Sequence, residues 1–381
     1  MGSMALWRLA QRGVSAIGFE QFDPGHDRGS GHGESRMIRT AYYEGPDYVP
    51  LVRSAFGLWR ELERETGSDL LTMTGGLMIG RRDGPLLTGT LHSIQEHRLP
   101  HEVLDRRAAL QRYPQHRLET GEIIVYERDA GVLRPEAAIL AATRRAEALG
   151  ARIVSRTRVT SLRVERDGVA VDADGVVYRG RRAVVCAGPW LSKLLPEQRV
   201  PLEVERQVML WMGVRESEEF SPARCPPFLH ERDGHYLFGV PTLDGETVKI
   251  MIHHEGQPAD PDLLDRRLHP SDVQPVARLV ESCLAGVSAA PIRYQVCMYT
   301  NTPDRHFAVG LLPEASAVVQ VSACSGHGFK FAPVIGEAAA DLALHGETAH
   351  PIAGFSPGRW KGGAMPALGA RGRSGRQTEP P

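Results

Sequence analysis

A lysine set among aliphatic residues is the most informative single residue of this sequence. Residues 247–253 read TVKIMIH, so Lys249 has apolar neighbours on both sides. On an extended strand Lys249, Met251 and His253 point to one face, and the intervening side chains point to the other. A lysine in this setting either protects the edge of a sheet or is a buried amine with a chemical role. The pattern by itself leaves both interpretations open.

Glycines and cations elsewhere suit the binding of an anion. Gly326 and Gly328 flank His327 where a strand is expected to pass into a helix. The backbone there can approach a bound ring, and the helix N-terminus can stabilise negative charge. Lys330 follows, and Arg39 could bind a carboxylate with both arms of its guanidinium. Taken alone, Lys330 could equally be a solvated residue at a helix end. The arginine-rich stretch around Arg39 could equally be a surface turn.

The N-terminal residues have the pattern of the second half of a nucleotide-binding βαβ unit. A helix over 3–12 precedes a strand over 14–19, and Glu20 is the acid at the end of that strand. We interpret Gly2 as the last glycine of the fingerprint, which lets helix and strand pack closely. We expect the first strand and two earlier glycines to be missing because of a start assigned too far downstream, with weaker binding of the dinucleotide as the result. Any helix–turn–strand of an α/β protein gives the same pattern.

Composition and cysteine content disfavour several classes of protein. The 45 basic and 46 acidic residues give a formal net charge of −1, without the basic excess that nucleic acid or anionic lipid attracts. No apolar run approaches the roughly 20 residues that span a bilayer, and the N-terminus lacks the apolar core of a secretory signal. The five cysteines are odd in number and include no Cys-x-x-Cys pair. We therefore expect no disulfide framework, no metal and a cytoplasmic protein.

Periodicity and turn residues predict further elements. A helix is expected where Pro135 opens an apolar repeat that Gly150 closes, and others are expected over 48–65 and 332–343. Strands are expected in these stretches: 70–81 (a strand pair), 151–157, 159–165, 169–173, 183–186, the surroundings of Val208, Tyr236 and Val248, and 317–323.

These elements indicate an α/β protein whose dinucleotide-binding domain is assembled from discontinuous segments. Residues 71–134 and 200–290 are expected to form a second, mostly antiparallel substrate domain. The tail over 361–381 is rich in Gly, Arg and Pro and has no apolar period, which predicts disorder. The Rossmann-like FAD-binding domain is expected to consist of residues 1–70, 135–199 and 291–360.

Three stretches carry a specific resemblance to a known family. Residues 29–43 read GSGHGESRMIRTAYY, residues 295–301 read QVCMYTN and residues 325–331 read SGHGFKF. In this order and spacing they resemble the monomeric sarcosine oxidase and N-methyltryptophan oxidase family of flavoproteins. The likeness runs from Gly2 to about Trp360. It implies an FAD-dependent oxidase that demethylates a small N-methyl amino acid.

The resemblance implies where FAD is attached. Cys297 matches the family residue that binds the flavin covalently through a thioether. The alternative is a buried thiol that only packs. Cys324 abuts the SGHG stretch and is the rival for attachment; we assign it to packing, because relatives usually have a different residue there. The cofactor contacts are expected to be completed by Gly2, Glu20, Val159, Gly188, Tyr299, Gly326 and Gly328.

The resemblance also implies roles for the charged residues. Arg39 and Lys330 match the pair that holds the substrate carboxylate, and two cations suit one carboxylate. Lys249 matches the lysine that activates dioxygen, since a cation stabilises the negative charge that oxygen gains. His253 matches a histidine near the substrate.

Two further comparisons concern the flavin and the substrate. His32 and Arg36 match residues lying against the flavin, and four positions apart they would share a face only on a helix. Phe238 stands where relatives that act on sarcosine have a tyrosine, which leaves a more apolar wall and favours a bulkier substrate. Tyr236 would point to the same face of an extended strand, and whether it supplies the missing hydroxyl is left open.

As a reaction, the resemblance implies transfer of a hydride equivalent from the N-methyl group of a neutral amine to the flavin. Water then hydrolyses the imine and releases formaldehyde. Dioxygen reoxidises the flavin and is reduced to hydrogen peroxide. The expected partners are a small amine substrate and dioxygen, and the expected state is a monomer. Two alternatives remain: an oxidase of another secondary or cyclic amine or imino acid, and a truncated, non-catalytic relative.

Overall fold

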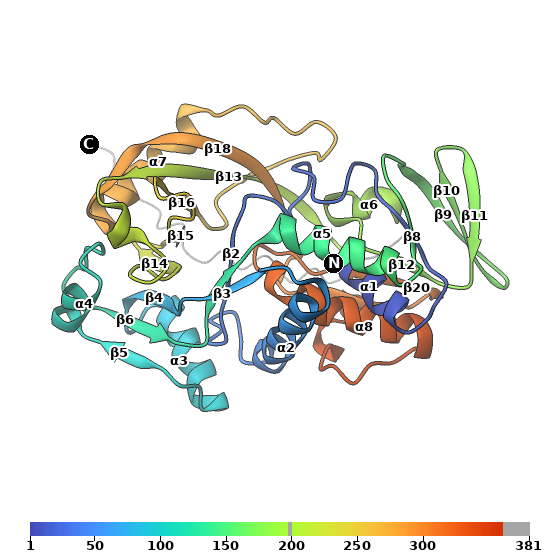
Figure 1. The fold of residues 1–381 in the computed structure, drawn as a ribbon, viewed down its shortest axis with the longest axis horizontal. Coiled ribbons are helices and arrows are strands. Elements are labelled where there is room, and N and C mark those ends of the chain that lie inside the picture. The colour runs from blue at the N-terminus through green and yellow to red at the C-terminus, as the bar shows by residue number, and fades with distance from the viewer. Residues whose placement is uncertain (197–199, 361–381) are drawn as a thin grey trace, which may run out of the picture.

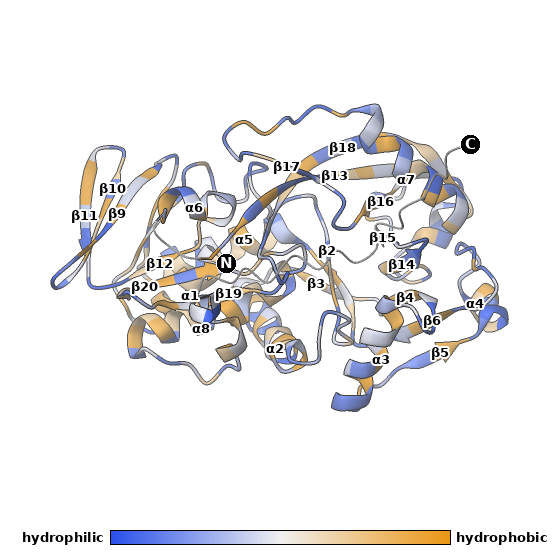
Figure 2. Ribbon diagram, turned by 180° about the vertical axis from the view of Figure 1, so that it is seen from behind, coloured by the Kyte–Doolittle hydropathy of each residue, from blue (hydrophilic) through white to orange (hydrophobic). Residues whose placement is uncertain are grey.

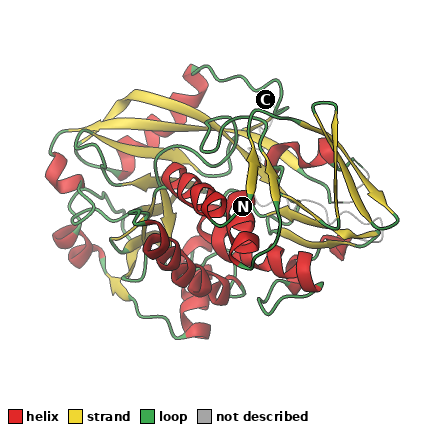
Figure 3. Ribbon diagram, turned by 45° about the vertical axis from the view of Figure 1, so that its right-hand side comes forward, coloured by secondary structure: helices red, strands yellow, loops and turns green. Residues whose placement is uncertain are grey.

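The computed structural model describes residues 1–196 and 200–360, so the predicted disordered tail over 361–381 lies outside the described residues. The molecule is mixed α/β, with parallel and antiparallel sheets. Two long paired strands, β13 (Glu203–Val214) and β18 (Val287–Asn301), run along the molecule and link its two ends (Figure 1). Turned by 45°, the long strands arch over a group of helices (Figure 3).

The predicted N-terminal helix forms α1 (Gly2–Gln11), which packs against α5 (Pro135–Ala148) and α8 (Ala332–His345). All three were expected from apolar periodicity. The contact with α8 is close, because a Cβ on Gly336 would lie 2.6 Å from the Cβ of Met4. Glycine at this position therefore sets the distance between the two helices.

The strands beside these helices form separate small sheets. β1 (Ile17–Phe19) pairs in parallel with β8 (Arg152–Val154). β20 (Ala315–Ser322) lies between β12 (Ala183–Val185), which is parallel to it, and β19 (Ala308–Leu312), which is antiparallel. A meander adds three strands, of which the last was not predicted: β9 (Val159–Glu165), β10 (Gly168–Ala173) and β11 (Val176–Gly180).

Apolar side chains mark the core of this region. They are concentrated on β12, β20 and the helices that face them, while the outer turns of the meander are polar (Figure 2). Val319 and Val321 of β20 pack with α8 and α1 in the largest cluster of buried residues. Among the described residues, none of the helices combines the length and apolarity needed to span a membrane.

A nine-stranded sheet fills the other end of the molecule and confirms the expected antiparallel strands around Val208, Tyr236 and Val248. Its pairs are antiparallel apart from β14 with β4, which run parallel. Besides β13 and β18 it contains β4 (Gly76–Arg81), β5 (Glu102–Leu104), β6 (Glu122–Glu127), β14 (Phe228–Arg232), β15 (His235–Val240), β16 (Thr247–Ile252) and β17 (Gln257–Pro258).

A three-stranded sheet joins the two ends and corrects one expectation. It consists of β2 (Arg36–Ile38), β7 (Gly131–Leu133) and β3 (Leu71–Met73). The residues over 70–81 do form two strands, but β3 and β4 belong to different sheets and do not pair with each other. Each finds its partner far along the chain, which a local turn signal cannot reveal.

The remaining helices cover the outside of the molecule. α2 (Tyr48–Thr66) ends at Gly67, whose φ of +66° is the left-handed conformation that favours glycine at a helix end. The other α-helices are α3 (Pro85–His97), α4 (Arg106–Arg112), α6 (Leu191–Leu194) and α7 (Pro270–Cys283). Short 3₁₀ turns occur at Gly188–Trp190, Ser217–Phe220, Phe329–Phe331, Ala353–Phe355 and Pro357–Trp360.

Candidate active site

A large cavity brings most of the predicted site residues together. Its volume is about 1580 Å³, beyond the roughly 300–1,000 Å³ typical of small-ligand pockets. It runs from the N-terminus of α1 and the end of β1, past the start of β9 and the end of β12, to β16, β18 and the SGHG segment. This length suits an extended cofactor together with a small substrate.

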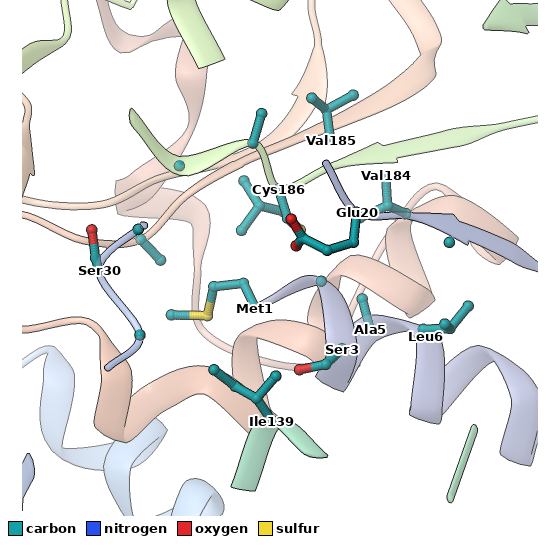
Figure 4. A pocket seen from close by; sticks show the side chains of 18 of the residues that line it. Met1, Ser3, Ala5, Leu6, Glu20, Ser30, Ile139, Val184, Val185 and Cys186 are labelled. Atoms are coloured by element: carbon teal, nitrogen blue, oxygen red, sulfur yellow. The ribbon is translucent and has the colours of Figure 1, made fainter. Parts of the chain in front are cut away.

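One end of the cavity is formed by the predicted nucleotide-binding residues. Gly2 begins α1, so the positive end of the helix dipole faces the cavity. Glu20 follows β1, and its Oε1 accepts the Phe22 N–H at 2.9 Å, which holds the carboxylate in place. Val159 and Gly188 also line this end, and the φ of Gly188 is +52°. Met1, Glu20 and Ser30 surround this part of the pocket (Figure 4).

Two cysteines lie on the wall toward the middle of the cavity. Cys297, on β18, is only 2% exposed, and its burial raises the pKa of the thiol to about 11, against the opposing charges of Arg36 and Lys249. Cys324 also lines the cavity, and its sulfur accepts the N–H of Thr300 at 3.3 Å. The backbone hydrogen bond gives Cys324 a local partner within the chain.

Lys249 is a buried amine. β16 lies between β13 and β15, so the residue does not protect the edge of a sheet. Its Nζ donates hydrogen bonds to the carbonyl oxygens of Gly33 at 2.9 Å and Ser35 at 2.5 Å. Burial, and next the charge of Arg36, lowers the pKa of Lys249 well below its ordinary value. In its ammonium form the group has three donors, and a third N–H then remains beyond these two.

Two cations converge on one tyrosine at the far end of the cavity. The Arg39 guanidinium lies 4.2 Å from the centre of the Tyr42 ring, and Lys330 Nζ donates to the Tyr42 hydroxyl at 3.2 Å. Arg39 also donates to Glu44 at 2.6 Å, and Lys330 to the carbonyl of His327 at 2.7 Å. Burial, followed by the charge of Arg39, lowers the pKa of Lys330 to about 7. Because Glu44 pairs with Arg39, the net positive charge of this cluster comes from Lys330 while its amine is protonated.

His253 and Tyr299 form the wall between the cysteines and this cluster. The Nδ1 of His253 lies 3.0 Å from the Tyr299 hydroxyl. Burial lowers the pKa of His253 well below its ordinary value, so the ring is neutral at neutral pH. Gly326 has a φ of +76°, and a Cβ there would lie 2.7 Å from both rings. A Cβ on Gly328 would lie 1.7 Å from the carbonyl of Ala323. Contacts within the chain therefore require both glycines.

Comparison with known proteins agrees with this arrangement. The family model described as FAD dependent oxidoreductase matches residues 1–342. The chain belongs to this family. Its FAD-dependent chemistry and its fold are those of an oxidase that acts on CH–NH donors.

Individual relatives cover nearly the whole oxidoreductase. A monomeric sarcosine oxidase of Streptomyces avermitilis is 39% identical over 94% of this chain and 95% of its own length. An N-methyl-L-tryptophan oxidase of Citrobacter koseri is 32% identical over 94% and 96%. In fold, NikD, an amino acid oxidase essential for nikkomycin biosynthesis, has a TM-score of 0.82 at 23% identity, over 93% of this chain and 94% of its own.

The residues of this FAD-dependent oxidoreductase fit the cofactor. A helix N-terminus and the carboxylate of Glu20 stand at one end, where a pyrophosphate and a ribose need donors and an acceptor. The neutral His253 and the buried thiol of Cys297 stand at the other end, beside the cations. The volume between these ends holds a dinucleotide and leaves room for a substrate.

His32 is placed differently from the other predicted residues of the oxidoreductase. It is 2% exposed, and its Nδ1 lies 2.9 Å from Gln295 Oε1, while Arg36 is among the cavity residues and His32 is not. The segment between them is not helical: His32 lies in a loop and Arg36 begins β2. Arg36 donates to the carbonyls of Ser35 and Ser30, at 2.7 and 2.9 Å.

Other residues of the oxidoreductase's site were missed in the sequence. Tyr43 and Glu44 line the cavity beside Arg39, although neither was singled out. The signal that could have identified Glu44 is its position, five residues after Arg39 and one residue beyond the stretch 29–43. Phe238 also lines the cavity, whereas Tyr236 stacks on Tyr43 with ring centres 5.9 Å apart and is absent from the described lining.

Proposed function

We propose that this protein is an FAD-dependent oxidase that removes the N-methyl group of a small N-methyl amino acid. The products are the primary amino acid, formaldehyde and hydrogen peroxide. The observation that carries the proposal is that Arg39 and Lys330, which both contact the buried Tyr42, line the cavity that is also lined by Cys297 and Lys249. A carboxylate anchored at one end brings its N-methyl group toward the middle of the cavity.

Arg39 and Lys330 bind the substrate carboxylate in this proposal. Arg39 is held by Glu44 and by the carbonyl of Ala41, at 2.6 and 2.8 Å, so the guanidinium is already oriented before a ligand arrives. Preorganisation of this kind reduces the entropy lost on binding. Guanidinium N–H groups beyond those two remain for the carboxylate.

His253 and Tyr299 position the amine and exclude water. A neutral imidazole does not repel an approaching amine, and it can accept a proton at a ring nitrogen. Their buried position helps the amine to react in its neutral form, whose lone pair stabilises the positive charge that develops as the C–H bond breaks. Bound FAD supplies the redox chemistry, accepting two electrons from that bond and passing them to dioxygen.

Lys249 serves the reaction with dioxygen. Its Nζ is fixed by two carbonyl acceptors in the cavity wall. There it interacts electrostatically with Arg36 and Cys297. An N–H beyond those two contacts can stabilise negative charge on oxygen in a site shielded from water.

Cys297 is the proposed point of covalent attachment. Cys297 would hold the flavin through a C–S bond to its 8α-methyl carbon; forming that bond would remove the S–H hydrogen and one C–H hydrogen, and dioxygen would take up these two electrons and two protons as hydrogen peroxide. Arg36 and Lys249 favour the thiolate that this reaction needs, in opposition to the burial that raises the pKa of the thiol. Gly2, Glu20, Val159, Gly188, Tyr299, Gly326 and Gly328 are proposed to complete the cofactor site.

An apolar wall favours a substrate larger than sarcosine. Phe238 lines the cavity, and Tyr236, whose ring stacks on Tyr43, is not among the described residues that line it, which supports an apolar wall where relatives that act on sarcosine have a tyrosine. We propose a more hydrophobic N-methyl amino acid on this ground.

The protein is proposed to act as a cytoplasmic monomer on this amine and dioxygen. Its five cysteines are unpaired, which suits a reducing compartment. The division into an FAD domain and a substrate domain, with the segments given above, belongs to the same proposal.

A substrate panel tests the reaction. The holoenzyme is incubated with N-methyl amino acids of increasing side-chain size and with cyclic imino acids, and peroxide and formaldehyde are both measured. Equal amounts of the two products from an N-methyl amino acid support demethylation. Peroxide without formaldehyde, from a cyclic imino acid alone, would instead identify the protein as an oxidase of that second class.

Acid precipitation tests the attachment. We expect yellow, fluorescent flavin to stay with the precipitated wild-type chain and with Cys324→Ala, and to be released from Cys297→Ala. Retention of flavin by Cys297→Ala together with its release from Cys324→Ala would move the attachment to the other thiol.

A further inference from the structure

The segment that carries Arg36 and Arg39 is held at both ends by glutamate carboxylates. At its start, Glu136 in the first turn of α5 accepts the N–H groups of Gly33 at 2.6 Å and Glu34 at 3.0 Å. At its end, Glu127 of β6 accepts the backbone N–H groups of Thr40 and Ala41, at 2.6 and 3.0 Å. Neither carboxylate is among the described residues that line the cavity.

Glu136 is linked to Lys249 through a single peptide group. The peptide between Gly33 and Glu34 offers its N–H to the Glu136 carboxylate and its carbonyl oxygen to Lys249 Nζ, at 2.9 Å. Hydrogen bonds that share a peptide polarise one another, and both partners at the ends of this chain are ionisable. The negative charge of Glu136 also opposes the effect of burial, which lowers the pKa of Lys249.

The backbone at this point has an uncommon conformation, which is held by Glu136 and also by Arg293 and Trp211, the two residues that donate to the Glu34 carboxylate. Gly33 has a φ of +99° and Glu34 a φ of +66°, so two successive residues are left-handed, one of them with a side chain. This conformation is costly for a residue other than glycine and persists where the surroundings enforce it. A Cβ on Gly33 would also lie 2.6 Å from the end of Met209. Glu136 is the group that binds both N–H groups of this turn.

We propose that Glu136 is a positioning residue for the reaction with dioxygen: it fixes the Gly33–Glu34 peptide so that its carbonyl holds Lys249 Nζ in the cavity wall. The proposal rests on the function proposed above for Lys249. Glu136 does not touch substrate or dioxygen in this arrangement; it acts through the loop and through its negative charge, both of which favour a fixed, protonated Lys249. The reductive half of the reaction, which depends on Arg39 and Lys330, does not use this contact.

Glu136→Gln provides the direct test, because it keeps the size of the side chain and removes its charge. Holoenzyme is reduced with dithionite and mixed with oxygenated buffer, and the return of the oxidised flavin absorbance is followed. We expect the second-order rate constant for dioxygen to fall about tenfold, in the range seen when a residue that orients a functional group is lost. Anaerobic reduction by substrate is expected to proceed at the wild-type rate.

Glu127→Gln is the matched control, since it loosens the other end of the same segment. It is expected to leave the rate constant for dioxygen at the wild-type value. An equal decrease in that rate constant in both variants would show that the loop responds to any loosening, and would overturn a specific role for Glu136. An unchanged rate constant in Glu136→Gln would overturn it as well.

A double-mutant cycle separates action through Lys249 from general damage. In a Lys249→Met background, Glu136→Gln is expected to cause no further decrease in the rate constant for dioxygen, because the group it positions is gone. A further tenfold decrease would contradict the proposal.

Amide hydrogen exchange gives a readout without turnover. The N–H groups of Gly33 and Glu34 should exchange faster in Glu136→Gln and keep their wild-type rates in Glu127→Gln. If Glu136→Gln fails to fold, Glu136→Asp, which shortens the reach, is subject to the same criteria.

Chemical reduction keeps this test independent of the substrate. Dithionite supplies the electrons whatever amine the enzyme oxidises. The rate constant for dioxygen can therefore confirm or contradict the role of Glu136 even if no N-methyl amino acid reduces the flavin. In that case the proposed substrate class fails and the positioning role is judged separately.

Discussion

Lys330 changes its charge near neutral pH, which affects how the protein binds a carboxylate. Burial, and then the charge of Arg39, lowers its pKa to about 7, while Glu44 acts in the opposite direction. Below that pH the amine is an ammonium and adds to the charge of Arg39. Above it the amine is neutral, and one of the two cations at the anchor is lost. Substrate affinity at this end should therefore decrease as the pH rises.

The expected outcome is a rise in the inhibition constant of a small carboxylic acid between about pH 6 and pH 8. A carboxylate without an amine is the right probe, because the amine of a substrate titrates as well and becomes more reactive at high pH. Lys330→Met should bind the inhibitor more weakly at low pH and show no such pH dependence. A wild-type inhibition constant that stays flat across this range would mean that Lys330 does not contact the carboxylate.

At the residue scale, the sequence predicted the groups of the site better than their contacts. The apolar residues beside Lys249 left open an edge-strand lysine and a buried amine, and the structure shows the buried amine. The partners that hold it, Gly33 and Ser35, lie more than 200 positions away, and no periodicity connects them. His32, which the resemblance places against the flavin, is not among the described cavity residues, and its contact with Gln295 could not be read from the sequence.

At the scale of elements, prediction succeeded where the signal was local. α2 and α8 were found from their apolar repeats, and α5 from its opening Pro135 and closing Gly150, because those features depend on neighbours in sequence. β11 was missed because both its faces are largely exposed, so its residues do not alternate between apolar and polar. The pairing of β3 and β4 with each other was wrong because their partners lie elsewhere in the chain.

The packing of α1 against α8 gives a prediction at this scale. Gly336→Ala would place a Cβ 2.6 Å from Met4, so the two helices must separate. We expect a loss of about 1–3 kcal/mol in the free energy of unfolding, the usual cost of overpacking a core. Chemical denaturation of the holoenzyme measures it.

Gly57 of α2 is the matched control for Gly336. It is also a helical glycine, but it is exposed, and a Cβ there would meet nothing within 4 Å. Gly57→Ala should stabilise the protein by up to about 1 kcal/mol through its better helix propensity. Similar effects of the two substitutions would show that the α1–α8 contact does not depend on glycine.

At the scale of the whole molecule, the cavity connects elements that no continuous core joins. Its walls come from α1, β1, β9 and β12 at one end and from β16 and β18 at the other. β1, β9 and β12 belong to three separate sheets and β16 and β18 to a fourth, so a ligand that fills the space contacts all four sheets. Binding of FAD should therefore stabilise the entire folded chain, because the unfolded chain offers no such site.

Cys297→Ala makes this stabilisation measurable, because its FAD is expected to exchange with solution. The midpoint of thermal unfolding of this variant should rise with FAD concentration, corresponding to about 2.7 kcal/mol at a hundredfold excess over Kd. Riboflavin should give a smaller rise, since it lacks the part that would reach Gly2 and Glu20. ADP, which fills only that end, should give a small rise as well. An equal effect of riboflavin and FAD would mean that the end formed by α1 and Glu20 contributes nothing to binding, and that the cofactor occupies only the half of the cavity beside β16 and β18.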